Sequence, residues 1–379
     1  MQTGIYNYVP IERVIWGKPA AEAVALEVDR SNAGRVFLVA SGTLSRQTGA
    51  ISAIQAALGQ RSVGLFDECR EHTPLQSVIA CARAVRKAEP DLIVTIGGGT
   101  PIDTVKIVQL CLSHDVRDVE DLLALANKPT SKPSSVRQII VPTTLSGGEY
   151  TSMGGGTDVS RKMKDMYLGP DLCGRAVILD PEITLHTPLW LWLSTAIRAL
   201  DHAIEGFCAP GTNAMIQATA LHAMKLLSQS LRLTKRNPRD LDARQNSQMA
   251  VWLAASGLGR VSMGASHGIG YLLGTIGGVP HGYTSCVMLP AVLRWNEPVI
   301  RPIQGEIASA LGMSGSSASE AVSALLDELG LPRRLSDVKI TAAQTAEIAD
   351  RAPSHPVVKG NPRPVHDRSD AMEILSYAS

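Results

Sequence analysis

The sequence predicts an α/β protein with a doubly wound, mainly parallel sheet in its N-terminal half and an all-helical C-terminal half. Short apolar runs rich in β-branched residues alternate with helical patterns as far as about residue 187. Beyond that point the strand pattern stops, and apolar residues recur every three or four positions. Strands that alternate with helices favour a parallel sheet with helices on both faces.

Buried apolar runs, several of which end at glycine or at turn residues, predict the strands. In chain order they cover residues 35–42, 62–69, 91–99, 138–144 and 175–184. Apolar spacing predicts helices at 44–58, 75–89, 187–208, 212–234, 241–259 and 317–330. Pro188 marks the change of pattern, so we expect a Rossmann-like domain over 1–187 and a helical domain over 188–379. A ligand is expected where the two domains meet.

The composition argues against several classes of function. The 379 residues carry a net charge of only +1 and 4% aromatic residues, which disfavours a nucleic-acid-binding surface. The six cysteines are scattered without a Cys-x-x-Cys pair, and the first residues lack a signal-peptide pattern. No apolar run reaches the roughly 18 residues that span a membrane. We therefore expect a cytoplasmic protein that binds a small molecule, without a nucleic-acid or membrane partner.

A glycine-rich segment follows the third predicted strand. It reads GGGTPIDTVK over residues 97–106 and differs from both the G-x-G-x-x-G fingerprint and the P-loop. Three glycines let the backbone approach a ligand closely, and Pro101 suits the first turn of a helix. The N–H groups at such a helix start favour an anion such as a pyrophosphate. Asp103 and Lys106, close to that helix start, favour a ligand site over a plain strand–helix turn.

A second segment, IRALDHAIEG over residues 197–206, places a permanent cation inside an apolar helix. Arg198 and His202 are four residues apart and therefore share one helix face. On these residues alone, a solvated helix edge explains the pair as well as a functional site does.

Several motifs in order along the chain resemble the iron-containing (group III) alcohol dehydrogenases, a family that includes glycerol dehydrogenases, dehydroquinate synthases and maleylacetate reductases. The motifs are GGGTPIDTVK, the HAIEG that follows Arg198, ERVIWG near the start, VPTT (141–144), ILDPEIT (178–184), PHG (280–282), LP (289–290) and NPRPV (361–365). The resemblance covers nearly the whole chain. It implies hydride transfer with NAD(P) and a homodimer formed through the N-terminal regions.

The resemblance also implies a set of cofactor-binding residues. These are Ser41, Gly98, Gly99, Thr100, Asp103, Thr143, Thr144, Gly147 and Lys164. A dinucleotide fold usually carries an acidic residue for NAD after its second strand, whereas this chain has Ala40, Ser41 and Gly42 there. Arg46, one turn later, could pair with a 2′-phosphate. We therefore expect NADPH to be slightly favoured, with NADH left open.

Metal-using members of the family bind a divalent ion through one aspartate and three histidines. By resemblance, Arg198 replaces the aspartate and Met263 replaces one histidine, while His202 and His281 are retained. Asp201 is expected to point about 100° away from its neighbour His202 and not to restore the site. The sequence therefore predicts no catalytic metal, similar in kind to the maleylacetate reductases, although a zinc site of three histidines stays open.

The resulting hypothesis is reduction of a carbonyl by NAD(P)H, with a carboxylate-bearing oxo-acid as the expected substrate. Arg198 would stabilise the developing oxyanion or bind the carboxylate, and His267 would orient the substrate. His202 or His281 would deliver the proton, and a nearby arginine should lower the pKa of an imidazole. The alternatives are a metal-dependent alcohol dehydrogenase, a lyase of the dehydroquinate synthase type and a non-catalytic nucleotide-binding scaffold.

Overall fold

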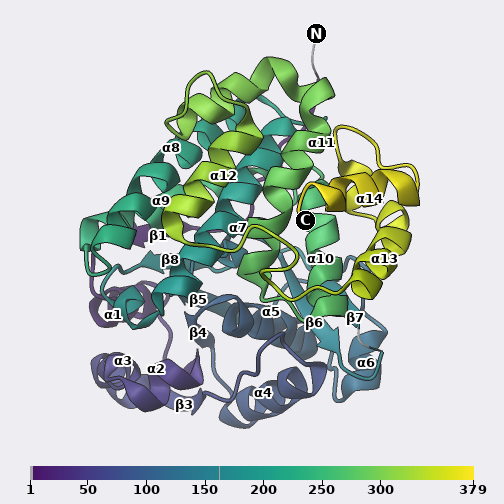
Figure 1. Ribbon diagram of the computed structural model, residues 1–379. Coiled ribbons are helices and arrows are strands. Elements are labelled where there is room, and N and C mark those ends of the chain that lie inside the picture. Colours follow the sequence, from purple (N-terminus) through teal and green to yellow (C-terminus); the bar gives the residue numbers. More distant parts are fainter. Residues whose placement is uncertain (1–2, 162) are drawn as a thin grey trace. The chain divides into compact units, whose positions relative to one another are not determined.

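The computed structural model describes residues 3–161 and 163–379, and the chain divides into two units, Met1–Thr187 and Pro188–Ser379 (Figure 1). In the described residues, the first unit contains the strands together with helices, and the second is built from helices. The fold class expected from the sequence is therefore confirmed.

Six parallel strands form the main sheet, in the order β1-β8-β5-β4-β2-β3. Their bounds are β1 Arg13–Trp16, β2 Val36–Ala40, β3 Ser62–Phe66, β4 Leu92–Gly97, β5 Arg137–Pro142 and β8 Ala176–Leu179. The register pairs Ala40 with Ile96 and Gly97 with Pro142. The loops after β2, β4 and β5 therefore leave the sheet side by side, at the edge where α/β proteins bind their ligands.

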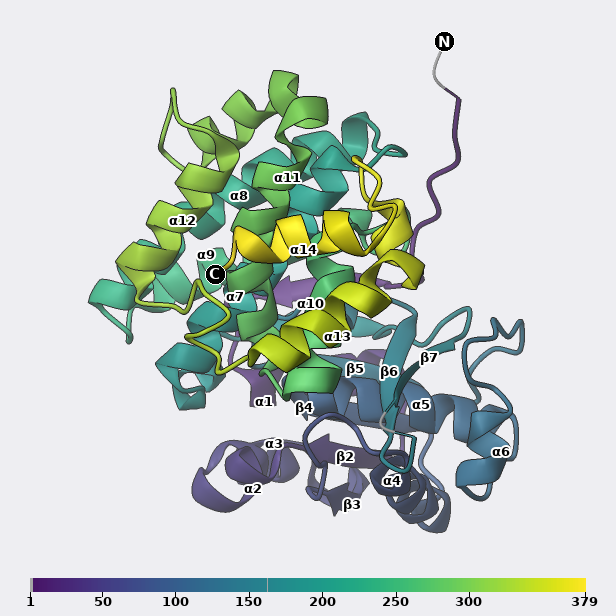
Figure 2. The same cartoon turned by 45° about the vertical axis from the view of Figure 1, so that its right-hand side comes forward.

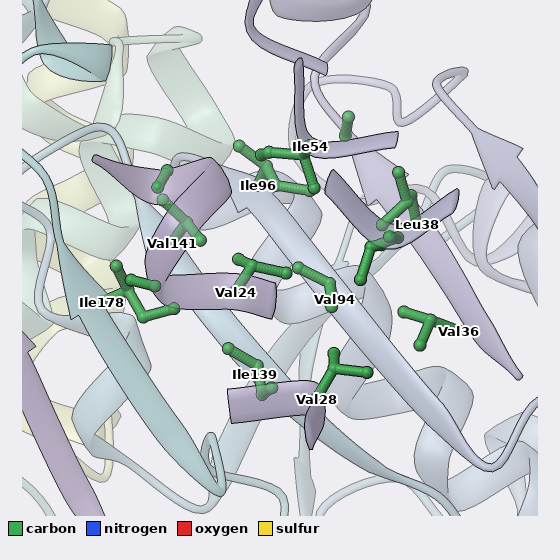
Figure 3. Close-up of a cluster of buried hydrophobic side chains, with 14 of the residues drawn as sticks. Val24, Val28, Val36, Leu38, Ile54, Val94, Ile96, Ile139, Val141 and Ile178 are labelled. Carbon is green, nitrogen blue, oxygen red and sulfur yellow. The ribbon is translucent and has the colours of Figure 1, made fainter. Parts of the chain in front are cut away.

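Helices cover both faces of this sheet, as a doubly wound fold requires. They are α1 Ala20–Arg30, α2 Gly42–Gln47, α3 Ala50–Leu58, α4 Leu75–Ala88, α5 Gly99–Ser113 and α6 Val119–Leu123. On one face, Val24 and Val28 of α1 pack with the sheet residues Val94, Ile139 and Ile178 (Figure 3). On the other face, α4 and α5 pack against the alternate residues of the same strands. The alternation follows from the two-residue period of a strand.

Several details differ from the sequence prediction. The strand expected over 175–184 ends at Leu179, because the Asp180 carboxylate accepts hydrogen bonds from the N–H groups of Glu182 and Ala20, and a short 3₁₀ helix follows over Ile183–His186. The helix expected over 44–58 is broken between α2 and α3. An antiparallel hairpin of β6 Met153–Asp158 and β7 Met163–Leu168 was not expected, because its glycine-rich and polar strands lack an apolar alternation.

The second unit consists of helices, several of which pack against the 30-residue helix α11. They are α7 Leu189–Cys208, α8 Ala214–Arg236, α9 Leu241–Ala254, α10 Ala265–Gly277, α11 His281–Ala310, α12 Ala318–Leu329, α13 Ala342–Arg351 and α14 Arg368–Ser376. The helices α13 and α14 lie beside α10 and α11 and share one apolar core with them (Figure 2). Among the described residues, no helix combines the length and the hydropathy needed to cross a bilayer.

Candidate functional site

The glycine-rich segment connects β4 to α5 by a turn that only small residues permit. Gly97 has a φ of +152°, a region that L side chains rarely adopt. A Cβ on Gly98 would lie 2.8 Å from Cγ2 of Thr144, and one on Gly99 would lie 3.4 Å from Oγ of Ser146. The loops after β4 and β5 therefore approach each other at van der Waals distance, which leaves backbone N–H groups near the start of a 15-residue helix.

The loop after β5 brings the other predicted residues to the same edge. The N–H of Thr143 donates to the carbonyl of Gly97 over 2.9 Å, and Gly147 has a φ of +75°. Leu145 is buried, so its side chain belongs to the core. Ser41, after β2, lies at this edge too, because its N–H donates to the carbonyl of Ile96. The structure thus brings the segments around residues 41, 97–100 and 143–147 together.

Two further predicted residues, Asp103 and Lys164, meet at the β6–β7 hairpin. The N–H of Gly155 donates to Oδ2 of Asp103 over 3.1 Å. The side chain of Lys164 crosses the same glycine, since a Cβ there would lie 2.1 Å from its Cε. Asp103 therefore joins the first turns of α5 to the hairpin that presents the lysine. Thr100, in the first turn of α5, is half-buried.

Lys106 does not serve the role that the sequence indicated. Its side chain is fully buried, and its Nζ donates to Oγ1 of Thr151, to the carbonyl of Met153 and to the carbonyl of Gly148. Burial lowers the pKa of Lys106 and raises that of the buried Glu149 to about 7. This lysine supports the loop after β5 from within the protein and is not available to a phosphate.

In the second unit, α7 buries an arginine among apolar residues. Arg198 is only 2% exposed, and its Nη1 donates to Oγ of Ser285 on α11 over 3.0 Å. Its guanidinium carbon lies 5.3 Å from the centre of the Tyr271 ring, and its Nε has no hydrogen-bond partner in the part of the chain that the structure describes. A buried cation with an unpartnered donor is an open binding group for an acceptor on a ligand.

The sequence did not predict the contacts that Asp201 makes. Its Oδ2 lies 3.8 Å from Nη1 of Arg198 and accepts hydrogen bonds from the hydroxyls of Ser285 (2.6 Å) and Ser266 (2.8 Å). Burial raises the pKa of Asp201, whereas the nearby His267 and Arg198 lower it. Because serines from α10 and α11 meet this face of α7, the aspartate forms part of the same cluster as the arginine.

Glu205, one turn after Asp201, fixes the state of a histidine. Its two carboxylate oxygens accept the N–H groups of Gly264 and Ser266, and Nδ1 of His267 lies 2.7 Å from Oε2. Burial raises the pKa of Glu205 to about 7, although the hydrogen bonds from these two backbone donors lower it. Burial also lowers the pKa of His267 to about 3. When Glu205 is ionised, both of its oxygens are acceptors and Nδ1 of His267 carries the hydrogen. The buried Nε2 of His267, which has no partner among the described residues, is then an acceptor.

His202 lies next to this histidine. The two ring centres are 4.8 Å apart, and Nδ1 of His202 has no hydrogen-bond partner within the described residues. Burial lowers the pKa of His202 well below its usual value, and repulsion from His267 in its protonated form and from Arg198 acts in the same direction. The expected direction is confirmed, although burial contributes more than the arginine does. Both buried imidazoles are therefore neutral at neutral pH.

Tyr271 connects the buried groups to an exposed histidine. Its ring stacks on that of His281 with centres 5.8 Å apart, meets that of His267 edge-on at 6.4 Å and lies 6.0 Å from that of His355. His281 is the first residue of α11 and is exposed. The four predicted catalytic residues are thus linked, with His281 joined to Arg198 through the tyrosine.

Sequence reasoning missed several residues of this cluster. They are Asp201, Glu205, Ser266, Tyr271, Ser285 and His355. The spacing of two carboxylates four residues apart, within a helix of otherwise apolar residues, was a usable signal for the first two. The others have no comparable pattern, because their helices are brought to α7 only by the tertiary fold.

Among the described residues, Asp201, Glu205 and His267 form a group whose ligand-type atoms lie within 4.8 Å of one another. Most of those atoms already accept or donate hydrogen bonds inside the protein, as described above. His202 is not part of this group.

Comparison with known proteins places both units in one family. Residues 11–181 match the family described as iron-containing alcohol dehydrogenase, and residues 192–379 match the C-terminal region of the same family. The chain belongs to the iron-containing alcohol dehydrogenase family. It is therefore an oxidoreductase, as the sequence predicted.

Relatives in this family include several maleylacetate reductases. The chain is 34% identical to the dehydrogenase ALT3 of Alternaria alternata, over 91% of this chain and 98% of the relative. It is 30% identical to a maleylacetate reductase of Sphingobium indicum, over 99% of this chain and 97% of the relative. The crystal structure of maleylacetate reductase from Agrobacterium tumefaciens superposes with a TM-score of 0.85 at 25% identity, over 100% and 98% of the two chains.

Proposed function

We propose that this protein reduces the carbonyl group of a carboxylate-bearing oxo-acid with NAD(P)H and without a catalytic metal. The observation that carries the proposal is the buried Arg198, whose Nε has no partner among the described residues and whose charge acts on the neutral His202 and His267 nearby. A fixed guanidinium stabilises negative charge that develops on a carbonyl oxygen, and it binds carboxylates in a bidentate way. The relatives named maleylacetate reductase support an oxo-acid as the substrate class.

The nucleotide would be bound by the residues at the carboxyl edge of the sheet. At Gly98 a Cβ would collide with Thr144, so only the bare glycine backbone fits there. Such a backbone can approach a pyrophosphate closely. The proposed contacts are Ser41, Gly98, Gly99, Thr100, Asp103, Thr143, Thr144, Gly147 and Lys164. Once bound, the reduced nicotinamide supplies a hydride for the carbonyl carbon. We favour NADPH slightly over NADH, because Arg46 lies just after the second strand.

The histidines divide the remaining work. His267 donates through Nδ1 to Glu205, so its Nε2 can orient a substrate by accepting a hydrogen bond from it. His202 and His281 are the two proposed proton donors. We assign proton delivery to His281, because an exposed imidazole can regain its proton from water, whereas burial keeps His202 neutral.

The residues of the second unit fit a divalent ion poorly. At an effective dielectric constant of about 20, a dication about 4 Å from a guanidinium is repelled by about 8 kcal/mol. Asp201 would offset part of this repulsion, but its Oδ2 already accepts two serine hydroxyls, and both oxygens of Glu205 accept backbone N–H groups. Among the described residues, Oδ1 of Asp201 has no partner, so it is the carboxylate oxygen of the group that a metal would meet without competition from these hydrogen bonds.

That three-residue group nevertheless favours a second candidate function, a metal-dependent alcohol dehydrogenase. The two candidates are separated by purifying the protein from medium that contains iron and zinc, measuring bound metal, and following the absorbance of NADPH with maleylacetate and a panel of other oxo-acids. We expect oxidation of NADPH that a chelator does not change, with metal far below one ion per chain. One bound ion per chain, lost together with activity on chelation, would refute the metal-free mechanism.

A substitution at Arg198 tests the role of this residue directly. Arg198→Asp places a carboxylate one helical turn before His202, and we expect this variant to lose activity with oxo-acids. If the variant keeps the activity of the unaltered protein, the proposed role of the arginine is wrong.

A further inference from the structure

A carboxylate lies beside the end of β2, although the residues that follow this strand contain none. Asp67 comes directly after β3, the parallel neighbour of β2, and the register pairs Val39 with Phe66. Because parallel neighbours end at the same edge, Asp67 stands next to Ala40 and Ser41. The residues that directly follow the second strand do not include Asp67, because it follows the neighbouring strand β3.

Arg46 on α2 reaches this carboxylate. Its Nη1 lies 3.8 Å from Oδ2 of Asp67, and its Nη2 donates to the backbone carbonyl of Asp67 over 3.3 Å. The guanidinium also folds over Gly42, since a Cβ there would lie 2.0 Å from Nη2. A cation and an anion thus lie together where β2 ends. The Arg46 side chain is 61% exposed, so it is accessible to a ligand.

These two side chains suit the two forms of a nicotinamide dinucleotide in opposite ways. In dinucleotide-binding folds the adenosine ribose is read after the second strand, where a carboxylate accepts the 2′-hydroxyl and an arginine accommodates a 2′-phosphate. A carboxylate next to a 2′-phosphate repels it, whereas a guanidinium forms charge-assisted hydrogen bonds with it.

We infer that Arg46 and Asp67 together set the choice between NADPH and NADH, with Asp67 competing with the 2′-phosphate for the guanidinium of Arg46. This inference rests on the proposed function, because it requires that the first unit bind the dinucleotide. It adds a specificity-determining residue, Asp67, that the sequence pattern of the second strand does not contain. In the unaltered protein the two opposing groups keep the affinities for NADPH and NADH within about tenfold of each other.

The test is a direct binding measurement that needs no substrate. NADPH and NADH are titrated separately into the full-length protein, and the two Kd values are taken from the change in nucleotide fluorescence. The variants are Arg46→Met, Asp67→Asn and Gly42→Ala, the last of which displaces the guanidinium without changing the charge. Arg61→Met is the matched control, because Arg61 precedes β3 at its other end and pairs there with Asp29.

We expect Arg46→Met to weaken NADPH about tenfold or more and to change the Kd of NADH by less than twofold. Gly42→Ala should weaken NADPH in the same direction but less strongly. Asp67→Asn should shift the ratio of affinities about five- to tenfold toward NADPH, and Arg61→Met should leave the ratio unchanged. The melting temperature of each variant, without nucleotide, reports on its folding.

Two outcomes overturn the inference, and they are distinguishable. If both nucleotides bind but the ratio stays within twofold in Arg46→Met and in Asp67→Asn, the inference fails and the proposed function stands. If neither nucleotide binds to the unaltered protein, the proposed function fails, and this inference fails with it.

Discussion

Replacing Arg198 tests the proposed chemistry most directly. The structure indicates what the replacement does to stability and to activity. The guanidinium lies 3.8 Å from the Asp201 carboxylate, which corresponds to about 4 kcal/mol of attraction at an effective dielectric constant of about 20. Arg198→Met alone would therefore leave a buried, uncompensated carboxylate and destabilise the fold by several kcal/mol. The double variant Arg198→Met with Asp201→Asn removes both charges, and an asparagine can still accept the hydroxyls of Ser266 and Ser285.

We expect the double variant to recover most of the stability but not the activity. Loss of one preorganised donor to a developing oxyanion costs about 3 to 4 kcal/mol, or a factor of about 10² to 10³ in kcat/KM. The assay compares NADPH oxidation with the best oxo-acid, and urea unfolding, in Asp201→Asn, the double variant and Arg198→Lys. The lysine keeps the charge but not the planar fork, so its loss should be smaller. A folded double variant with kcat/KM within about threefold of the unaltered protein would refute the reasoning.

Three further predictions concern the first unit. Gly98→Ala should weaken dinucleotide binding at least tenfold, because its Cβ would lie 2.8 Å from Thr144, whereas Gly49→Ala meets no atom within 4 Å and should bind normally in the same fluorescence titration. Lys106→Met removes the donor of three hydrogen bonds, to Oγ1 of Thr151 and to the carbonyls of Gly148 and Met153, so urea unfolding should show a loss of about 3 kcal/mol. Burial raises the pKa of Glu149 from 4.5 to about 7, so the folded state retains a proton that the unfolded state has released. Its contribution to stability should therefore fall by about 3 kcal/mol between pH 4.5 and pH 7, and unfolding of Glu149→Gln measured across this range should lack this slope; an equal slope in both proteins would contradict the assignment.

The sequence predicted those strands whose apolar residues form a clear pattern. The central strands β2, β4 and β5 are buried on both faces and read as continuous apolar runs. The edge strand β1 is short and partly exposed, and β6 contains three glycines in a row, so neither has a period that marks a strand.

The glycine loop was predictable as a feature, but its purpose in the fold was not. Three glycines after a strand indicate close backbone approach, and the structure identifies the approaching group as the side chain of Thr144. Lys106 was misjudged, because a position near a helix start does not show which way a long side chain turns. Its three acceptors come from a loop more than forty residues later in the chain.

The contacts of Asp201 could not be predicted for a different physical reason. A helical wheel gives the direction of a side chain relative to the helix axis, and by that measure Asp201 is about 100° from His202. However, residues 192–207 of α7 are buried all the way round, so each direction meets another part of the protein. What Asp201 meets depends on α10 and α11, and no local pattern in the sequence gives their placement.

The buried polar groups on and around α7 indicate where a ligand would bind. Burying a charge in an apolar helix is unfavourable unless hydrogen bonds replace water, and the Glu205 carboxylate is satisfied in this way. In the same cluster four buried atoms have no partner among the described residues, namely Nε of Arg198, Oδ1 of Asp201, Nδ1 of His202 and Nε2 of His267. Native proteins rarely leave buried polar atoms unpaired, and the exceptions gather at functional sites, where local rules are broken for binding or catalysis. The hydrogen bonds of Glu205 thus account for its burial within the protein, whereas Arg198 and the two imidazoles leave groups open to a ligand. The proposed substrate would offer an acceptor to Arg198 and a donor to His267.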